Sequence, residues 1–239
     1  MQSTNRVIVV KGIGKHSATP DLIVLQMNLE VVQPQYDQTM QCAAKALDAL
    51  RLAITSAGHD GKNLKTTRFK IDTKHESRKV RDEWKDYYVG YACEHGLSLE
   101  FDFDMAKLGA TLDAIAKYEL APNTIHESDK ISIHDAIIKF QIKPKIKINF
   151  SIKNPDAVSE RLLQNAIENA KNKAGILAQS AGVKLGVIQR IDYNWEELQI
   201  YSKTDYSIRE EMCLSDRCME ITPEDIDVSD TVTVVWEII

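Results

Sequence analysis

The chain has 239 residues, of which 44% are hydrophobic and 27% charged, and its formal net charge at pH 7 is −5. A chain of this length buries about 70% or more of its unfolded surface, so a core can form without disulfides or metals. The acidic balance excludes nucleic acid as the main partner, because phosphate recognition needs an excess of basic residues. No run approaches the ~18 apolar residues of a membrane span, so membrane insertion is not expected.

The N-terminus runs from Met1 directly into a strand-like segment, Val7–Val10, with no basic region followed by an apolar stretch. This pattern lacks a secretion signal and predicts a cytoplasmic protein. A chain from which an export signal has been removed would look the same, so a periplasmic or cell-envelope location is the alternative.

The four cysteines fall into two groups. Cys42 lies in a helical pattern and Cys93 in a strand pattern, where a free cysteine usually acts as a small buried hydrophobe. Cys213 and Cys218 lie close together in an irregular region, but they supply at most half of a metal site. We therefore expect no metal and no cofactor, and neither count nor spacing requires a disulfide.

The first half of the chain alternates strands and helices. Val7–Ile13 and Leu22–Val32 read as strands, joined by a turn that contains Gly, Ser and Pro. The apolar spacing then predicts a helix over Asp37–Ala57 that Gly58 ends. Its expected buried face is Met40, Ala43, Ala44, Leu47, Leu50 and Ile54. Three segments follow: a strand at Thr66–Lys74, a charged hairpin tip at His75–Asp86, and a long strand at Tyr87–Phe103.

Asp104 is placed to cap a second helix. Its expected apolar stripe is Met105, Leu108, Leu112, Ile115 and Ala116, and Pro122 and Asn123 close the segment. Further strands are expected at Ile131–Ile142 and Lys145–Ile152, with Pro144 marking a bend or a sheet edge between them.

The third helix has the clearest signals in the chain. Asn154 suits the N-cap, Pro155 the first helical position and Asp156 the helix dipole. The helix should run to Ala181, about 26 residues and about 39 Å. Its stripe repeats every four residues: Val158, Leu162, Ala166, Ala170, Ala174 and Ala178. Leu163, Ile167 and Leu177 broaden it. The small residues of the stripe, together with an interior Gly175, predict very close packing; Gly182 ends the helix.

A strand is expected at Leu185–Tyr193 and a terminal strand at Thr231–Ile239. Between them the pattern loosens over Trp195–Asp230, a long irregular stretch of mixed aromatic and polar residues. Such segments are either functional or mobile. Trp195, Tyr201 and Tyr206 are therefore the candidate residues for contact with a partner or ligand.

The composition of these elements predicts an α+β fold, with antiparallel sheets on which long helices pack. Ser-Ala-Gly ends both the first and the third helix, at Gly58 and Gly182, and each is followed by a strand containing Ile-Asp. A duplicated β-α-β unit would explain this echo, and so would chance. The chain is read as one unit of residues 1–239, or two packed halves of about 1–125 and 126–239, with a variable segment at 195–230.

Several short motifs occur in an order that resembles the SIMPL family. They lie at residues 12–14, 20–21, 66–71, 90–91 and 107–109 and along the third helix with its exit, and the resemblance covers about residues 6–194 and the last strand. The positions singled out are Gly12, Gly14, Pro20, Asp21, Gly90, Tyr91, Ala174, Ala178, Gly182 and Gly186.

The resemblance implies an α+β fold, a tendency to self-assemble, and no catalytic residues to carry over. Members of the family are often exported to the cell envelope, and some are linked to stress tolerance. A further branch is associated with signalling kinases as partners. The missing export signal and the unmatched Trp195–Asp230 region are the two departures of this chain from the family pattern.

Other patterns have ordinary structural explanations. Gly12 and Gly14 lack the third glycine and the following helix of a phosphate loop, so a strand junction with permissive backbone angles is favoured. The six histidines are scattered, and His59 and His75, each beside an acidic residue, are read as solvated loop residues. Alternating carboxylates at Glu100, Asp102 and Asp104 fit the wet face of a strand.

Three lysines, Lys143, Lys145 and Lys147, alternate with isoleucines. They fit an edge strand protected against aggregation better than an anion site.

Three functions remain open at this stage. The first is a non-enzymatic self-assembling or protein-interaction protein, a homo-oligomer with itself or an unknown protein as partner. The second is a small-ligand binder with a pocket under segment 195–230. The third is an unrecognised enzyme or metal protein, although no constellation of catalytic residues is present in the sequence pattern.

Overall fold

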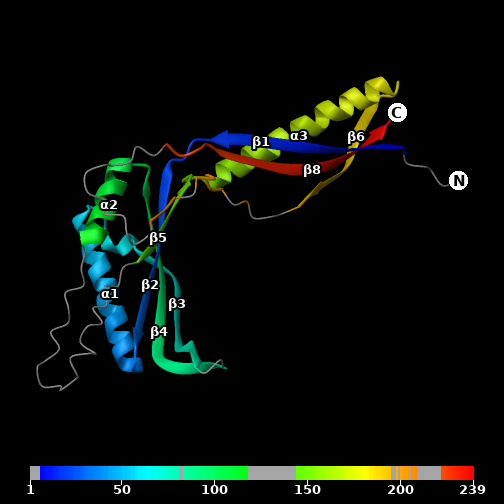
Figure 1. Cartoon of the computed structure of the whole chain (residues 1–239). Helices are drawn as coiled ribbons and strands as arrows, with labels where there is room; N and C mark the ends of the chain where they lie inside the picture. The colour runs from blue at the N-terminus through cyan, green and yellow to red at the C-terminus, as the bar shows by residue number, and fades with distance from the viewer. Residues whose placement is uncertain are drawn as a thin grey trace, which may run out of the picture. The chain divides into compact units, whose positions relative to one another are not determined.

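The computed structural model describes residues 6–80, 83–117, 144–194, 198, 200–204, 206–208 and 222–239 (Figure 1). The elements in chain order are β1 Val7–Ala18, β2 Leu22–Gln33, α1 Tyr36–Ser56, a short 3₁₀ turn Gly61–Asn63, β3 Lys65–Val80, β4 Glu83–Asp102, α2 Met105–Lys117, β5 Lys145–Ser151, α3 Pro155–Ser180, β6 Leu185–Tyr193, β7 Tyr206–Ile208 and β8 Ile226–Ile238. The strands form one sheet in the order β1-β8-β6 and another in the order β3-β4-β2-β5-β7. The predicted α+β fold is confirmed.

The chain divides into two units that are interleaved along the sequence. Unit 1 consists of Met1–Leu22, Phe150–Thr204 and Pro223–Ile239, and unit 2 of Ile23–Asn149 and Asp205–Thr222. These boundaries differ from two successive halves that meet near residue 125. The Ser-Ala-Gly sequence that ends both helices has a similar backbone conformation in the two places, since Gly58 and Gly182 both have positive φ, 85° and 67°. The two strands that precede and follow α1 are β2 and β3, and they lie in the same sheet. Those that precede and follow α3 are β5 and β6, and they lie in different sheets.

In unit 1, α3 lies on one face of the three-stranded sheet, mainly over β1 and β8 (Figure 1). Its N-terminus is capped as predicted, because the side-chain oxygen of Asn154 accepts a hydrogen bond from the Ala157 amide at 3.1 Å. The predicted four-residue repeat is also confirmed, because its residues are the buried ones of this helix. Of the residues expected to broaden it, Leu163 and Ile167 are half-buried and Leu177 is exposed. The resulting core contains Val10, Ala166, Ala170, Ala174, Val232, Val234 and Trp236.

The glycines that allow close packing lie on the strand, not on the helix. A β-carbon on Gly12 would lie 2.7 Å from Cβ of Ala170, and one on Gly14 would lie 2.8 Å from the carbonyl carbon of Leu162. Neither glycine has a positive φ, so the predicted need for permissive backbone angles is wrong and the reason is steric. Gly175 is exposed with nothing within 4 Å of its Cβ position, so its predicted packing role is also wrong.

A second core cluster in unit 1 gathers around the first turns of α3. It contains Ile152, Val158, Leu162, Ile200 and Ile226. Asp21 ties the β1–β2 turn to this cluster, because its carboxylate accepts from the Lys153 amide at 2.7 Å and its own amide donates to the Ser151 carbonyl at 3.0 Å. β1 continues to Ala18, so the turn before β2 is shorter than the sequence indicated.

In unit 2, α1 has the predicted length but a rotated buried face. Its buried residues are Thr39, Ala43, Ala46, Ala49, Leu50, Ala53 and Ile54. Ala44 is exposed, and Met40 and Leu47 are only half-buried, so that part of the predicted stripe is wrong. In α2 the predicted residues Leu108, Leu112 and Ile115 are buried, together with Thr111, while Ala116 is exposed.

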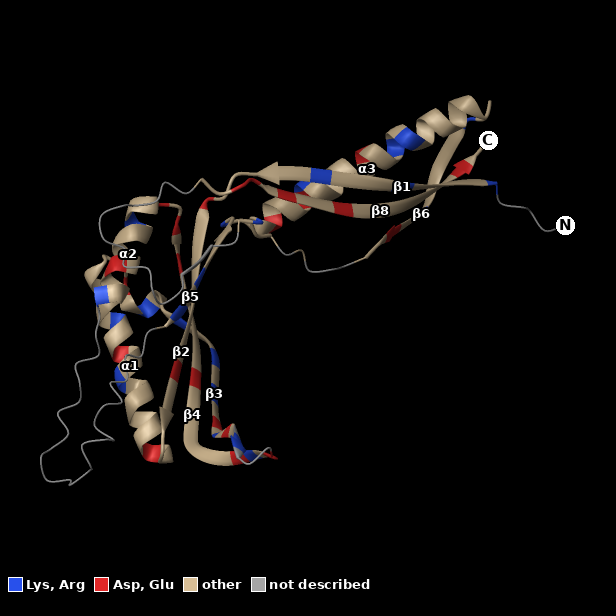
Figure 2. Ribbon diagram, viewed as in Figure 1, with Lys and Arg blue, Asp and Glu red and all other residues tan. Residues whose placement is uncertain are grey.

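The β3–β4 hairpin is longer than predicted. Its ladder continues from Lys65↔Ser98 to Val80↔Glu83, with shifts of register at 66/68 and 74/75. Most of the segment expected to be a hairpin tip, His75–Asp86, is therefore paired strand. Basic and acidic residues are mixed along this end of the hairpin (Figure 2). A stretch with so many charged residues reads as a loop in the sequence.

The prediction that Lys145 and Lys147 mark an edge strand is wrong. β5 lies between β2 and β7, and β7 pairs with it at Ile146, Lys147 and Ile148. Both lysines are exposed and Ile148 is fully buried, so the alternation reflects the two faces of an interior strand. β8 begins at Ile226, which shortens the segment expected to be irregular up to Asp230. The predictions for Lys143, Pro122–Asn123, Ile131–Ile142, Cys213 and Cys218 lie outside the described residues.

Candidate interaction surface

The most exposed regular element of unit 1 is β6. It lies at one edge of the order β1-β8-β6, and its residues from Val187 to Asp192 are all exposed. Three of them are aliphatic: Val187 is 68% exposed, Ile191 51% and Ile188 48%. This exposure follows from the position of α3, which covers β1 and β8 and leaves most of β6 bare. An exposed aliphatic edge is a typical site for contact with another chain.

The two faces of β6 have different chemistry. Ile188 pairs with Trp236 and Ile191 with Val234, two residues of the core under α3, so both isoleucines lie on the helix-bearing face. Arg190 pairs with Val235 and lies on the opposite face with Asp192. Arg190 Nε is 2.9 Å from a carboxylate oxygen of Asp192. A register shift between residues 188 and 190 keeps both isoleucines on one face.

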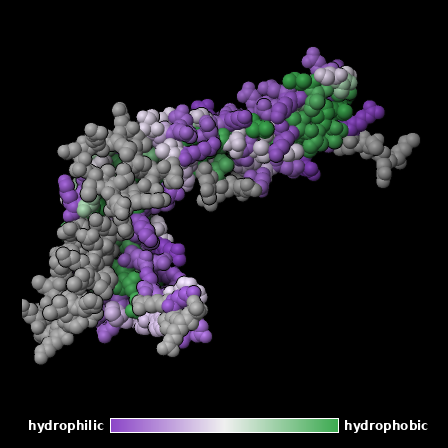
Figure 3. Space-filling view, viewed as in Figure 1, coloured by the Kyte–Doolittle hydropathy of each residue, from purple (hydrophilic) through white to green (hydrophobic). Residues whose placement is uncertain are grey.

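Two further aliphatic residues are exposed near the end of α3. Ile176 and Leu177 are exposed there, close in sequence to the turn that leads into β6. Figure 3 shows hydrophobic residues gathered at the end of unit 1 where α3 ends and β1 and β6 begin. Val7 and Val9 of β1 are also exposed. We call the exposed residues Ile176, Leu177, Val187, Ile188 and Ile191 the β6 surface.

The segment predicted to contact a partner is only partly described. Tyr201 is 48% exposed and forms an isolated β-bridge with Ser151, whose hydroxyl donates to the Ile200 carbonyl at 2.7 Å. Ile200 is buried. Residues 200–204 are therefore fixed to the core rather than loose. Trp195 and the side chain of Tyr206 lie outside the described part of the chain.

Two histidines are buried in unit 2, and for His59 the prediction of a solvated residue is wrong. His59 Nε2 lies 2.7 Å from Oγ1 of Thr111, whose hydroxyl itself donates to the Lys107 carbonyl at 2.6 Å. Because that hydroxyl proton is already used, His59 donates through Nε2–H. Burial, and secondly the positive charge of Lys107, lower the pKa of His59.

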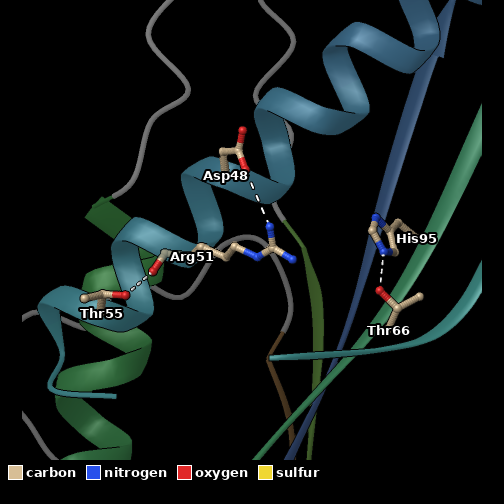
Figure 4. Close-up of polar contacts among 5 residues, drawn as sticks. All are labelled: Asp48, Arg51, Thr55, Thr66 and His95. Atoms are coloured by element: carbon tan, nitrogen blue, oxygen red, sulfur yellow. Dashed lines mark hydrogen bonds and ion pairs between the residues drawn. The ribbon is translucent and has the colours of Figure 1, made fainter. Parts of the chain in front are cut away.

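His95 follows the same pattern. Its Nε2 is 2.9 Å from the hydroxyl oxygen of Thr66, and its ring meets Phe69 edge-on at 5.1 Å between centroids. Burial, and secondly the charge of Arg51, lower the pKa of His95. Figure 4 shows this histidine beside the part of α1 that holds Arg51, which is also within 3.7 Å of Asp48. Each imidazole thus has a neutral threonine partner, as is usual for a structural histidine.

The remaining motif positions also have structural roles. Pro20 is buried. Gly90 has φ of 151°, and a β-carbon there would lie 2.8 Å from the carbonyl carbon of Gln33. Tyr91 meets Tyr36 edge-on at 5.7 Å between ring centroids. A β-carbon on Gly186 would lie 3.1 Å from the Glu237 carbonyl oxygen.

Sequence reasoning missed the β6 surface. The pattern of β6 correctly predicts a strand, but nothing in residues 185–193 says that the neighbouring helix covers only the other two strands. Within the described residues, no cluster of three or more His, Cys, Asp or Glu side chains is placed to hold a metal ion. In the same part of the chain, no helix has the length and apolar character needed to cross a bilayer.

One protein-family model matches this chain. It is SIMPL, described as a protein of unknown function (DUF541), and it matches residues 8–236. The match includes all the described strands and helices except the first residue of β1 and the last two of β8, which lie at the same end of the β1–β8 pair. No curated protein matches the sequence. The α3 stripe, the glycines of β1 and the match over nearly the whole chain agree, and the chain belongs to the SIMPL family.

Proposed function

We propose that this protein works by assembly with other protein chains, first of all with copies of itself, and not by catalysis. The observation that carries the proposal is the β6 surface, where three of nine residues in an edge strand are exposed aliphatic side chains. Covering these residues would lower the free energy of the protein, because full burial of an aliphatic side chain contributes about 1.5–3 kcal/mol relative to exposure. Contact with another chain achieves this.

The interior of the protein supports the non-enzymatic part of the proposal. The buried histidines are each hydrogen-bonded to a threonine of a neighbouring element, which accounts for both as structural groups. Burial raises the pKa of the Cys93 thiol, and a protonated thiol is a poor nucleophile. The environments of His59, His95 and Cys93 thus suppress the reactivity of these three side chains.

Size-exclusion chromatography with light scattering over a hundredfold range of concentration tests the proposal. The expected result is a mass that rises above the 27.0 kDa of one chain as the concentration increases. Val187→Lys should shift the rise to higher concentration, because it places a charge in the surface that becomes buried. Leu52→Lys is the matched control, since Leu52 is similarly exposed, at 64%, but lies on α1 in unit 2. A mass of one chain at every concentration would contradict the proposal.

A further inference from the structure

The charges and apolar residues of β6 specify which partner this edge accepts, an inference that rests on the proposed function. We propose that β6 pairs antiparallel with β6 of a second copy, with Ile191 of one chain opposite Ile191 of the other. The two three-stranded sheets would then join into one sheet of six strands. The interface is isologous, because each chain contributes the same strand to it.

The first argument is charge complementarity. In an antiparallel pair centred on Ile191, Arg190 of each chain lies opposite Asp192 of the second copy, because the positions on either side of the centre exchange. Opposite charges directly across a strand pair are stabilising, and like charges are destabilising. Within one chain the two side chains already point to the same face, 2.9 Å apart. The same charges can therefore pair between chains without a change of face.

The second argument is the apolar face. Ile188 and Ile191 lie on the helix-bearing face, but α3 lies over β1 and β8 and does not cover them. Antiparallel pairing about an axis perpendicular to the sheet puts the helix-bearing faces of both copies on the same side. The bare isoleucines of the two chains then form one strip, flanked by one α3 from each copy. Pairing in this register thus brings the isoleucines of the two chains against one another and reduces the aliphatic surface that each chain exposes to water.

The other sheet offers a comparison that favours β6. Its edge strand β3 carries the same arrangement, Lys70-Ile71-Asp72, with Lys70 and Asp72 in an ion pair. Ile71, however, is half-buried, whereas Ile191 is exposed. The charge pattern alone would allow pairing at either edge, but the uncovered isoleucine is on β6. β3 therefore supplies a matched control.

The test is a charge exchange in the full-length protein. Arg190→Asp places two aspartates opposite each other in both halves of the homodimer, and Asp192→Arg does the same with arginines. Each variant alone should raise the dissociation constant of the dimer about tenfold or more, measured by sedimentation or light scattering. An equimolar mixture of the two variants should restore the wild-type dissociation constant to within about threefold, because every pair in the mixed dimer is again of opposite sign. The rescue also shows that both variants are folded.

The control is Lys70→Asp, which should leave the dissociation constant unchanged. Wild-type protein that is monomeric at every concentration overturns the proposed function and this inference together. Assembly of Arg190→Asp and Asp192→Arg at the wild-type concentration overturns the inference alone and leaves the proposed function standing. Loss of assembly in Lys70→Asp but not in Arg190→Asp assigns the interface to β3 and also overturns the inference.

Discussion

Gly12 of β1 lies directly beneath Ala170 of α3, so close that a β-carbon on the glycine would be 2.7 Å from the β-carbon of the alanine. Ala170 is fully buried, as are its neighbours in the stripe, Ala166 and Ala174. Strand and helix therefore approach to a distance that only the smallest residues on both sides allow. This contact joins the N-terminal strand of unit 1 to a helix about 150 residues further along the chain, as the Ile13 amide also does by donating to the Asn169 side chain.

Two glycine substitutions should have effects of opposite sign. Gly12→Ala adds a methyl group where the helix backbone already stands, so it should lower the free energy of unfolding by about 1–3 kcal/mol. Gly175→Ala lies in an exposed turn of α3 with nothing within 4 Å of the new methyl group. It should raise the free energy of unfolding by about 0.5–1 kcal/mol, the difference in helix propensity. Urea denaturation of both variants measures the two values. Stabilisation by Gly12→Ala would contradict the close contact.

The helix side of the same contact gives a second prediction. Ala174→Leu should cost about 1–3 kcal/mol by overpacking, because Ala174 is fully buried against the sheet. Gln179→Leu is the control at an exposed position of the same helix, where glutamine and leucine have similar propensity, and should change stability by less than about 0.5 kcal/mol. Thermal or urea unfolding of the pair distinguishes packing from a general effect of leucine. Equal stability of the two variants would contradict tight packing, because it would mean that the sheet can move to accommodate a leucine at position 174.

Local signals in the sequence were sufficient for α3 but not for its surroundings. Asn154, Pro155 and the four-residue stripe act within one helix, so the sequence predicts its bounds to within one residue and predicts the buried four-residue repeat. Which strands the helix covers depends on the pairing of β1 with β8, residues at opposite ends of the chain. The exposed β6 surface follows from that pairing, which is why the sequence pattern could not reveal it.

The errors at individual residues have the same origin. The Lys145 and Lys147 alternation is compatible with an edge strand until β7, more than fifty residues later, pairs with β5. His59 follows a helix in a polar stretch of the sequence. It is buried because α2 packs against it and brings Thr111 within hydrogen-bond distance. In each case a distant element determines the environment of the residue.

Stability should decrease as the solution becomes acidic through the titration of the two buried histidines. Burial lowers the pKa of His59 and of His95 in the folded protein. In the unfolded chain each histidine binds a proton near its ordinary value of about 6.5. Below that pH the unfolded state therefore holds more protons than the folded state, so protonation favours unfolding. The contribution of both residues is complete above about pH 7 and is lost as the pH falls through 6.5 toward the lowered values.

Urea midpoints measured from pH 7.5 to 5.5 test this prediction. The double variant His59→Gln, His95→Gln should be less stable at pH 7.5, because the ring packing against Phe101 and Phe69 is lost. It should also show a shallower decrease between pH 7 and 5.5 than the wild type. His75→Gln, at an exposed position of β3, is the control and should follow the wild-type profile. A double variant with the full wild-type slope would mean that carboxylates, not these histidines, cause the decrease.

The attachment of β6 to the rest of unit 1 can be weakened without touching its outer surface. The Tyr193 hydroxyl donates to a carboxylate oxygen of Asp230 at 2.8 Å, which joins the end of β6 to β8, and this hydrogen bond is the first cause of the raised pKa of Tyr193. Removing the hydroxyl leaves the ring in the core but removes a hydrogen bond to a charged group. Tyr193→Phe should therefore lower the free energy of unfolding by about 1.5–3 kcal/mol.

The same variant separates the stability of β6 from its capacity to assemble. The Asp230 carboxylate keeps the hydrogen bond from the Thr231 amide at 2.6 Å, so the β8 backbone should stay in place and the loss should be local. Hydrogen exchange should then show faster exchange of the β6 amides, with the amides of α1 in unit 2 unchanged. If β6 frays in Tyr193→Phe, assembly through this strand must first order it again, and the dissociation constant should rise although no residue of the β6 surface has changed. Faster exchange in β6 together with an unchanged dissociation constant would place the interface elsewhere on the molecule.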